Sequence, residues 1–180
     1  VFVYNPIRDE LIQSSVHTSF IWDVCQGADG YVYASSMDNG LVCFNDEGTF
    51  LRNCWDVSSP TREGQGERLN CLLSIGDKIW FAMENNFMGY YRPEDATLHT
   101  FDITAQGFGS VRSLMEYDEH QLLLGTDNGL YLYDRTTQQF RRGDAAGGLW
   151  ALSDPTVNAL MRDVEGTLWV MTYAGGVNYM

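Results

Sequence analysis

Basic side chains are scarce in this chain. Its 180 residues include 24 acidic side chains against 11 lysines and arginines, which gives a formal charge of −13, and Lys78 is the single lysine. Proteins bind nucleic acids through basic side chains that neutralise phosphates, so the composition argues against a nucleic-acid partner. It also disfavours an acidic membrane surface or a strongly sulfated ligand, unless arginines such as Arg62, Arg68, Arg141 and Arg142 gather in space.

Long apolar runs and proline are also rare. No stretch approaches the roughly 18 apolar residues that a membrane span needs, and no secretion signal is present. The chain has 4 prolines but 18 glycines, and 44% of its residues are hydrophobic. This composition suits a β-rich domain with many tight turns.

Metal-ligand spacings and nucleophile motifs are missing as well. The histidines are single and scattered, at His17, His99 and His120, and no C-x-x-C or G-x-S-x-G motif occurs. Zinc sites and activated nucleophiles depend on such clusters. We therefore expect no catalytic residue, no metal and no cofactor in this chain.

The chain does contain a repeated order of short strands and turns. In Thr156–Met180 (TVNALMRDVEGTLWVMTYAGGVNYM) an alternating strand meets a turn at Glu165-Gly166, and a second strand leads through a Gly-Gly step into a third. The same order recurs in three earlier segments: Phe20–Asn45, Leu69–Tyr91 and Val111–Asp134.

The repeats share one period. Their second-strand residues Tyr33, Trp80, Leu123 and Trp169 lie 47, 43 and 46 positions apart, and a period of roughly 45 residues is typical of four-stranded propeller blades. A fourth strand is expected in Gly48–Val57, Ala96–Ile103 and Gln138–Asp144.

We predict an all-β fold, a β-propeller segment of about four four-stranded antiparallel blades. The repeats span residues 14–57, 58–103, 104–144 and 145–180, and residues 1–13 complete a preceding blade. A β-sandwich is the rival fold, but it would not repeat four ordered strands at one period. Both ends of the chain fall inside a blade, which favours a fragment of a larger propeller over a closed four-bladed ring.

The cysteines are expected to pack as buried free thiols. Around the Asn45–Gly48 turn, the pattern places Cys43 opposite Phe50, which argues against a bridge to Cys54. Cys25 and Cys71, on innermost strands of neighbouring blades, are the better disulfide candidates.

The last repeat resembles the two-component regulator propeller repeat, whose pattern is a V-x-x-L strand, an acidic D/E-G turn, L-W-V/I-x-T and a G-G-V/L step. The repeat at Val111–Asp134 keeps Val111, Leu114 and Asn128-Gly129-Leu130 but has Leu123 in place of the Trp. The two earlier repeats match mainly by spacing.

The resemblance implies a seven-bladed parent and a role as the periplasmic sensor domain of a Bacteroides-type hybrid two-component histidine kinase. Many sensors of this family detect oligosaccharides, and such sensors form dimers. This implies a non-catalytic segment, a homodimer, and attachment to the inner membrane through flanking segments that these 180 residues do not include.

Two sets of residues are candidates for ligand binding. Phe108 and Trp150 lie beside glycines in long loops and could stack on sugar rings, or they could pack beneath their own loops. The second set holds equivalent positions on the four innermost strands: Trp22, Asn70, Arg112 and Asn158. These four would either face a water-filled channel or form a hydrogen-bonding ring around a ligand.

Two other functions stay open. The blades could be a spacer or a dimer surface that binds no small ligand. Streptogramin lyases are built from similar repeats, and an enzyme of that kind would need two of the three histidines to converge with a glutamate.

Overall fold

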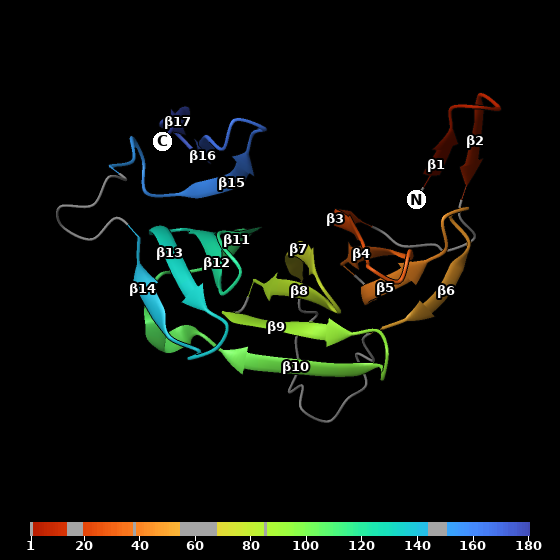
Figure 1. Cartoon of the computed structure of the whole chain (residues 1–180), viewed down its shortest axis with the longest axis horizontal. Helices are drawn as coiled ribbons and strands as arrows, with labels where there is room; N and C mark the ends of the chain where they lie inside the picture. Colours follow the sequence, from red (N-terminus) through yellow and green to blue (C-terminus); the bar gives the residue numbers. More distant parts are fainter. Residues whose placement is uncertain (1, 14–19, 38, 55–67, 85, 144–150) are drawn as a thin grey trace. The chain divides into compact units, whose positions relative to one another are not determined.

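The computed structural model describes residues 2–13, 20–37, 39–54, 68–84, 86–143 and 151–180, and β-strands dominate these ranges (Figure 1). Within them the one helical element is η1 (Thr104–Gln106), a single 3-10 turn. No helix in the described ranges is long and apolar enough to cross a membrane. The strands confirm the predicted all-β fold.

The strands form four consecutive antiparallel sheets, named here blades 1 to 4, and one separate hairpin. Blade 1 contains β3 (Ile21–Gln26), β4 (Val32–Ser36), β5 (Gly40–Phe44) and β6 (Phe50–Asn53). Blade 2 contains β7 (Leu69–Ile75), β8 (Lys78–Met83), β9 (Phe87–Arg92) and β10 (Thr97–Asp102). Blade 3 contains β11 (Val111–Glu116), β12 (Gln121–Thr126), β13 (Gly129–Asp134) and β14 (Phe140–Arg142). Blade 4 contains β15 (Val157–Arg162), β16 (Leu168–Thr172) and β17 (Val177–Tyr179), and the hairpin pairs β1 (Phe2–Asn5) with β2 (Glu10–Gln13).

Each blade is a simple meander, since strands that follow one another in sequence are neighbours in the sheet. The residues used to align the repeats all lie on second strands, and β6, β10 and β14 lie inside the ranges predicted for fourth strands. The predicted blade architecture is therefore confirmed.

The chain divides into two compact units. The first consists of Val1–Asn85 with Gly89–Thr100, and the second of Asn86–Met88 with Phe101–Met180. Blade 1 belongs to the first unit and blades 3 and 4 to the second, whereas the boundary passes through blade 2.

Apolar side chains fill both units. In the second unit, Leu123, Leu130 and Leu132 of blade 3 pack with Val157 and Val170 of blade 4 in one buried cluster. On the opposite face of blade 3, Tyr133 stacks on Phe101 of β10 with ring centroids 5.5 Å apart. Both faces of blade 3 are therefore covered, as the doubly apolar sequence of β13 requires. Gly125 permits the close approach, because a Cβ there would lie 2.6 Å from Val157 Cγ1.

In the first unit the core includes an aromatic pair that joins blades 1 and 2. Tyr33 of β4 and Tyr91 of β9 are buried, and their ring centroids lie 6.0 Å apart. Phe44 of β5 packs edge-on against Phe50 of β6 at 6.1 Å. Tilted and edge-on pairs of this kind stabilise a core beyond the area that they bury.

The acidic turn of the last repeat has a clear structural reason. Asp163 accepts hydrogen bonds from the backbone amides of Glu165 and Thr167 and from the indole Nε1–H of Trp169 at 2.8 Å. Gly166 has a φ of 89°, which favours glycine. The motif therefore couples the turn between β15 and β16 to the Trp on the second strand.

The register between β5 and β6 corrects the prediction for Cys43. Phe44 pairs with Phe50, but Cys43 pairs with Arg52, because the register shifts between Cys43 and Phe44. The backbone amide of Cys54 then donates to the carbonyl of Leu41 at 2.8 Å. The irregularity moves Cys54 closer to Cys43 than a regular hairpin would.

Candidate functional site

The equivalent positions on the four innermost strands share one backbone feature. In β3, β7, β11 and β15 the pairing register shifts across the second residue of the strand. These second residues are Trp22, Asn70, Arg112 and Asn158. A β-bulge leaves the extra residue out of the ladder and redirects its side chain, and bulges are frequent beside binding sites. The four predicted site residues thus occupy one repeated structural position.

In the first unit, an arginine covers the bulged tryptophan. Trp22 is 51% exposed, and the guanidinium carbon of Arg68 lies 4.4 Å from the centroid of its ring. Arg68 also forms an ion pair with Glu84, whose amide donates to the Arg68 carbonyl at 2.9 Å. The Nε of Arg68 is buried and has no hydrogen-bond partner within the described ranges. This arrangement combines an apolar ring, a cation and a buried donor.

Exposed apolar side chains extend the surface around Trp22. Phe20 is 62% exposed, Val24 55% and Met37 44%, and the amide of Met37 donates to the carbonyl of Phe20 at 3.0 Å. Asn70, at the equivalent bulge position of β7 in blade 2, is partly buried. The start of β3 therefore presents an open aromatic patch with polar groups beside it.

In the second unit the equivalent surface is polar. Arg112 forms an ion pair with Asp127, and the other carboxylate oxygen of Asp127 accepts from the amide of Ser110 at 3.0 Å. The hydroxyl of Thr156 donates to the carbonyl of Asp127 at 3.3 Å. Asn158 is exposed on β15.

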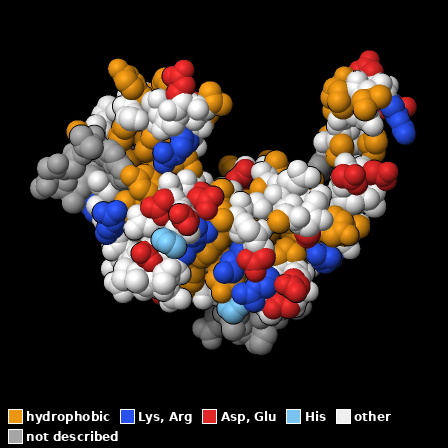
Figure 2. All heavy atoms as spheres, in the orientation of Figure 1, with side chains coloured by type: hydrophobic (Ala, Val, Ile, Leu, Met, Phe, Trp, Pro, Cys, Tyr) orange, Lys and Arg blue, Asp and Glu red, His pale blue; other side chains and the backbone are white. Residues whose placement is uncertain are grey.

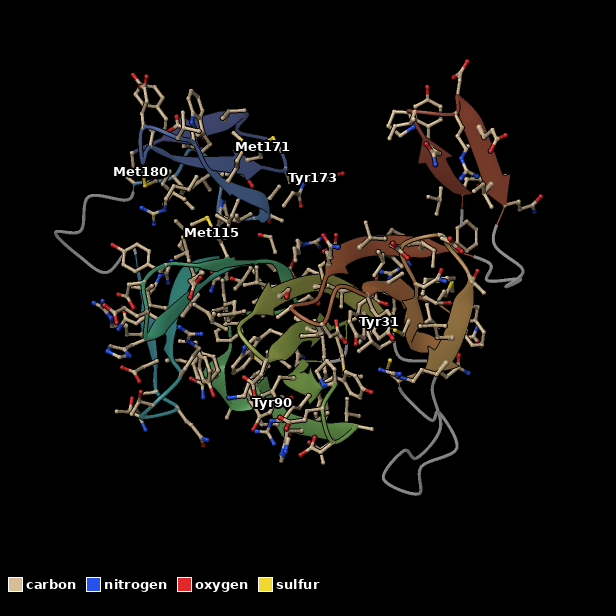
Figure 3. All side chains as sticks on the ribbon, turned by 45° about the vertical axis from the view of Figure 1, so that its right-hand side comes forward. Tyr31, Tyr90, Met115, Met171, Tyr173 and Met180 are labelled. Atoms are coloured by element: carbon tan, nitrogen blue, oxygen red, sulfur yellow. The ribbon has the colours of Figure 1, made fainter. Side chains whose placement is uncertain are left out.

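One exposed aromatic completes this polar surface. Tyr173 directly follows β16, and its amide donates to the carbonyl of Thr156 at 2.8 Å. Its side chain is 77% exposed and is labelled in Figure 3. Each unit therefore carries an exposed aromatic next to the bulge positions.

The loop aromatics have a different outcome. Phe108 is 1% exposed and packs against Tyr131 and Phe140, with ring centroids 4.6 and 5.6 Å away. Protein atoms cover its ring, so the prediction that Phe108 forms an exposed platform for sugar stacking is wrong. Phe108 instead packs beneath its own loop, which was the alternative prediction. Trp150 lies outside the described residues.

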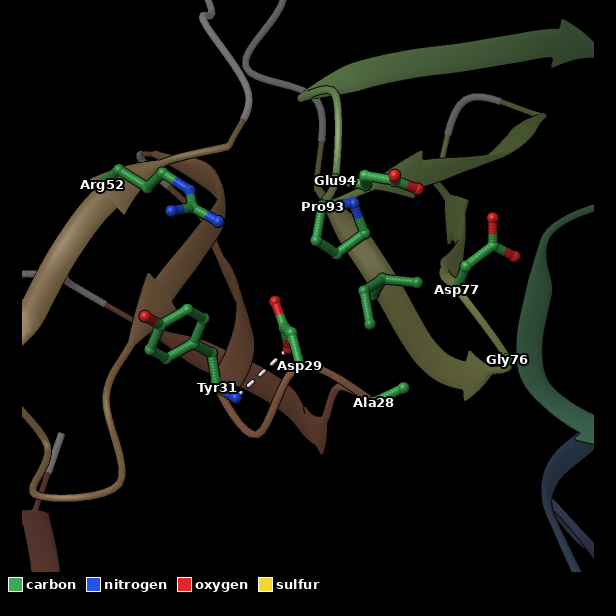
Figure 4. Close-up of a pocket in the computed structure, with 9 residues that line it drawn as sticks. Ala28, Asp29, Tyr31, Arg52, Gly76, Asp77, Pro93 and Glu94 are labelled. Carbon is green, nitrogen blue, oxygen red and sulfur yellow. Dashed lines mark hydrogen bonds between the residues drawn. The ribbon is translucent and has the colours of Figure 1, made fainter.

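A pocket of about 440 Å³ lies in the first unit, at the opposite ends of β3 and β7 from the bulges (Figure 4). Three turns and two strands, β6 and β8, line it, and its polar residues are Asp29, Tyr31, Arg52, Asp77 and Glu94. This pocket was not predicted from the sequence, because turns from two blades form it. Their only signal in the sequence is the recurrence of acidic residues in them.

Hydrogen bonds fix the aspartate of this pocket. Asp29 accepts from the hydroxyl of Tyr33 at 2.6 Å and from the amide of Tyr31 at 3.2 Å. Burial, followed by the bond to Asp29, raises the pKa of Tyr33 above its usual value. Tyr33 therefore remains a neutral donor at physiological pH.

Charged side chains of both signs mix on the face shown in Figure 2. Arg92 forms ion pairs with Asp77 at 3.3 Å and with Asp95 at 3.2 Å. Of the arginines considered as a basic cluster, Arg62 lies outside the described residues, and Arg141 donates to Gln121 at 3.4 Å. Exposed pairs of this kind contribute about 0–1 kcal/mol each.

The histidines give no catalytic arrangement in the described ranges. His99 stacks on Tyr90 at 4.7 Å on β10, the outermost strand of blade 2, and His120 lies in the turn between β11 and β12. His17 lies outside the described residues. Among the residues described, no group of three or more His, Cys, Asp or Glu side chains is arranged to hold a metal ion.

Comparison with solved structures finds the same fold in extracellular domains. That of the putative hybrid two component system BT4673 from B. thetaiotaomicron matches with a TM-score of 0.74 and 20% identity, over 99% of this chain and 24% of that one. That of the putative hybrid two component system BT3049 matches with a TM-score of 0.51 and 14% identity, over 99% of this chain and 30% of that one. The computationally designed Ika4 protein matches with a TM-score of 0.62 and 14% identity, over 95% of this chain and 96% of its own.

These similarities establish the fold. The chain has the fold of β-propeller blades. It spans about a quarter of the length of the BT4673 domain. No family model and no curated protein matches the sequence.

Proposed function

We propose that this chain is part of the extracytoplasmic sensor of a two-component regulatory protein and that it recognises an oligosaccharide. The observation that carries the proposal is the shared fold with the extracellular domain of a putative hybrid two component system over 99% of the chain. Fold alone does not determine function, so the proposal also depends on the side chains at the bulge positions.

Those side chains suit a sugar ligand. Saccharides place the apolar faces of their rings on aromatic side chains, while amides, carboxylates and guanidinium groups bind their hydroxyls. Trp22 supplies a half-exposed ring, and Arg68 and Asn70 lie on the adjoining blade of the same unit. Arg112 and Asn158 supply the polar groups of the second unit.

The proposed role is non-catalytic. A kinase portion, an inner-membrane anchor and a homodimeric arrangement belong to the parent protein that we propose, in which this chain is a segment of a larger propeller in the periplasm. Ligand binding would then act through contacts between domains or subunits.

A protein-binding role for the same surface is the second candidate. The exposed apolar side chains Phe20, Trp22, Val24 and Met37 favour it, because contiguous apolar patches often mark protein interfaces. In that case the surface would contact a second copy of the chain and bind no sugar.

Thermal unfolding against a panel of neutral and acidic oligosaccharides tests the proposal. A ligand at 100 times its dissociation constant stabilises a protein by about 2.7 kcal/mol, which moves the transition by a few degrees. We expect one glycan class to raise the midpoint for the wild type and for Phe2→Ala, a similarly exposed aromatic on the hairpin, but not for Trp22→Ala. No shift with any glycan, together with concentration-dependent dimerisation that Trp22→Ala abolishes, would support the protein interface instead.

A further inference from the structure

The pocket of about 440 Å³ in the first unit lies away from the bulge positions on which the proposed function depends. Figure 4 shows its polar residues on two sides: Arg52 with Tyr31 on one, Asp77 with Glu94 on the other, and Asp29 between them. The first side belongs to blade 1 and the second to blade 2, and all of these residues lie in the first compact unit. The volume lies within the range of about 300–1,000 Å³ that is typical of small-molecule sites. The pocket is therefore a candidate binding site of its own.

The side from blade 1 carries a positive charge without a counter-ion. Arg52 forms no ion pair with any residue that the structure describes, and its buried Nε has no hydrogen-bond partner among them. Its guanidinium carbon lies 5.9 Å from the centroid of the Tyr31 ring, which holds the group beside an aromatic face. A guanidinium group binds a carboxylate through two parallel hydrogen bonds. This side of the pocket therefore suits a carboxylate.

The side from blade 2 carries negative charge. Glu94 is exposed in the turn between β9 and β10 and belongs to no ion pair within the described ranges. Asp77 accepts from Arg92 at 3.3 Å through its Oδ2, and its side chain remains 61% exposed. Carboxylates form charge-assisted hydrogen bonds with ammonium groups. This side of the pocket therefore suits an ammonium group.

The space between the two sides is part polar and part apolar. Each oxygen of Asp29 accepts one hydrogen bond, from the amide of Tyr31 or the hydroxyl of Tyr33, whereas a carboxylate can accept about four. Asp29 can therefore accept a further bond from an amide group of a ligand. The remaining lining includes three apolar residues: Ala28, Ile79 and Pro93.

Opposite charges on the two sides select a ligand with opposite charges at its ends. A neutral saccharide would cover these groups without neutralising them, and burying an unpaired charge is costly. A short peptide with free termini has an ammonium group, a carboxylate, and amides between them. We propose that this pocket binds such a peptide, with its carboxylate on Arg52 and its ammonium group on Glu94 and Asp77. This proposal does not depend on the sensor role.

Calorimetric titration of the whole chain with trialanine tests the proposal on the wild-type protein. N-acetyl-trialanine lacks the ammonium group and trialanine amide lacks the carboxylate, but both keep the same side chains. We expect saturable binding of trialanine and at least about tenfold weaker binding of each blocked peptide, because each loses one charged contact. No saturable binding of trialanine, or equal affinity for trialanine and either blocked peptide, would overturn the proposal.

Variants assign the two ends of the peptide. Arg52→Gln should weaken trialanine binding by about tenfold and leave the affinity for trialanine amide unchanged. Glu94→Gln should weaken trialanine by a smaller factor, because Asp77 remains, and leave the affinity for N-acetyl-trialanine unchanged. The controls Arg141→Gln and Glu47→Gln make the same changes of charge at exposed positions outside the pocket and should bind trialanine as the wild type does.

A further variant separates this site from the proposed sugar site. Trp22→Ala should bind trialanine with wild-type affinity, since Trp22 does not line the pocket. Loss of trialanine binding in Trp22→Ala, or equal losses in the pocket variants and their controls, would overturn the assignment to this pocket.

Discussion

Asp23 joins the innermost strands of blades 1 and 2. Its Oδ2 accepts a hydrogen bond from the amide of Leu72 at 2.8 Å, and its own amide donates to the hydroxyl of Ser35 at 2.8 Å. Asp23 directly follows Trp22, so these bonds fix the backbone beside the bulge. The position of the proposed aromatic site therefore depends on a contact between two blades.

Removing this carboxylate should destabilise the first unit. Asp23→Ala leaves the amide of Leu72 without its acceptor, and we expect a loss of about 1–3 kcal/mol in the free energy of unfolding. Asp23→Asn keeps one oxygen acceptor and should lose less. Urea titration followed by circular dichroism measures both, and Asp46→Ala, at an exposed turn, is the control with an expected change within about ±0.5 kcal/mol. Equal stability of Asp23→Ala and the control would show that the contact between the blades contributes nothing.

Asp163 should make the last repeat sensitive to acid. The hydrogen bond from the indole of Trp169, followed by those from the turn amides, lowers the pKa of Asp163 below its usual value. A carboxyl group whose pKa is lower in the folded state stabilises the fold above its unfolded pKa of about 3.9, and this contribution is lost as the pH falls through the folded value.

NMR can follow this titration at the indole itself. We expect the Trp169 Hε1 resonance to move as the pH falls below about 4, and to be insensitive to pH in Asp163→Asn. A resonance that moves equally in both proteins would exclude Asp163 as the titrating group.

Gly125 should tolerate no side chain. A Cβ at this position would meet Val157 Cγ1 at 2.6 Å within the packed contact between blades 3 and 4, and overpacking of a core costs about 1–3 kcal/mol. Gly125→Ala should lower the free energy of unfolding by that amount and so lower the denaturation midpoint, whereas Ala174→Ser, on an exposed turn, should change neither. An unchanged midpoint for Gly125→Ala would mean that blades 3 and 4 are less closely packed.

The repeat pattern predicted most of the fold because strand alternation and turn residues are local signals. The second-strand alignment of Tyr33 with Trp169 holds, and the fourth strands lie where expected. The predicted register at Cys43 was wrong, because a single irregularity between Cys43 and Phe44 shifts the pairing. No residue type at this position indicates such an irregularity in the sequence. Such shifts depend on how a strand twists against its neighbours.

The candidate site was only partly predictable for the same reason. Equivalence between repeats found the positions of Trp22 and Arg112, although their shared bulge became visible only in the sheet pairing. The loop around Phe108 has a composition typical of a binding loop. The burial of Phe108 by Tyr131 and Phe140 depends on contacts that sequence spacing does not specify. The covering of Trp22 by Arg68 joins residues of two blades and was missed.

NMR titration of the indole resonances with the stabilising glycan tests the central claim most directly. Trp22 should shift progressively and saturate with ligand, whereas Trp169, held by Asp163, should not move. In Trp22→Ala the remaining indole resonances should be unaffected by the same glycan. Saturable shifts of Trp169 without any change at Trp22, or the same binding affinity in Trp22→Ala, would contradict the assignment of sugar recognition to the bulged strand of blade 1.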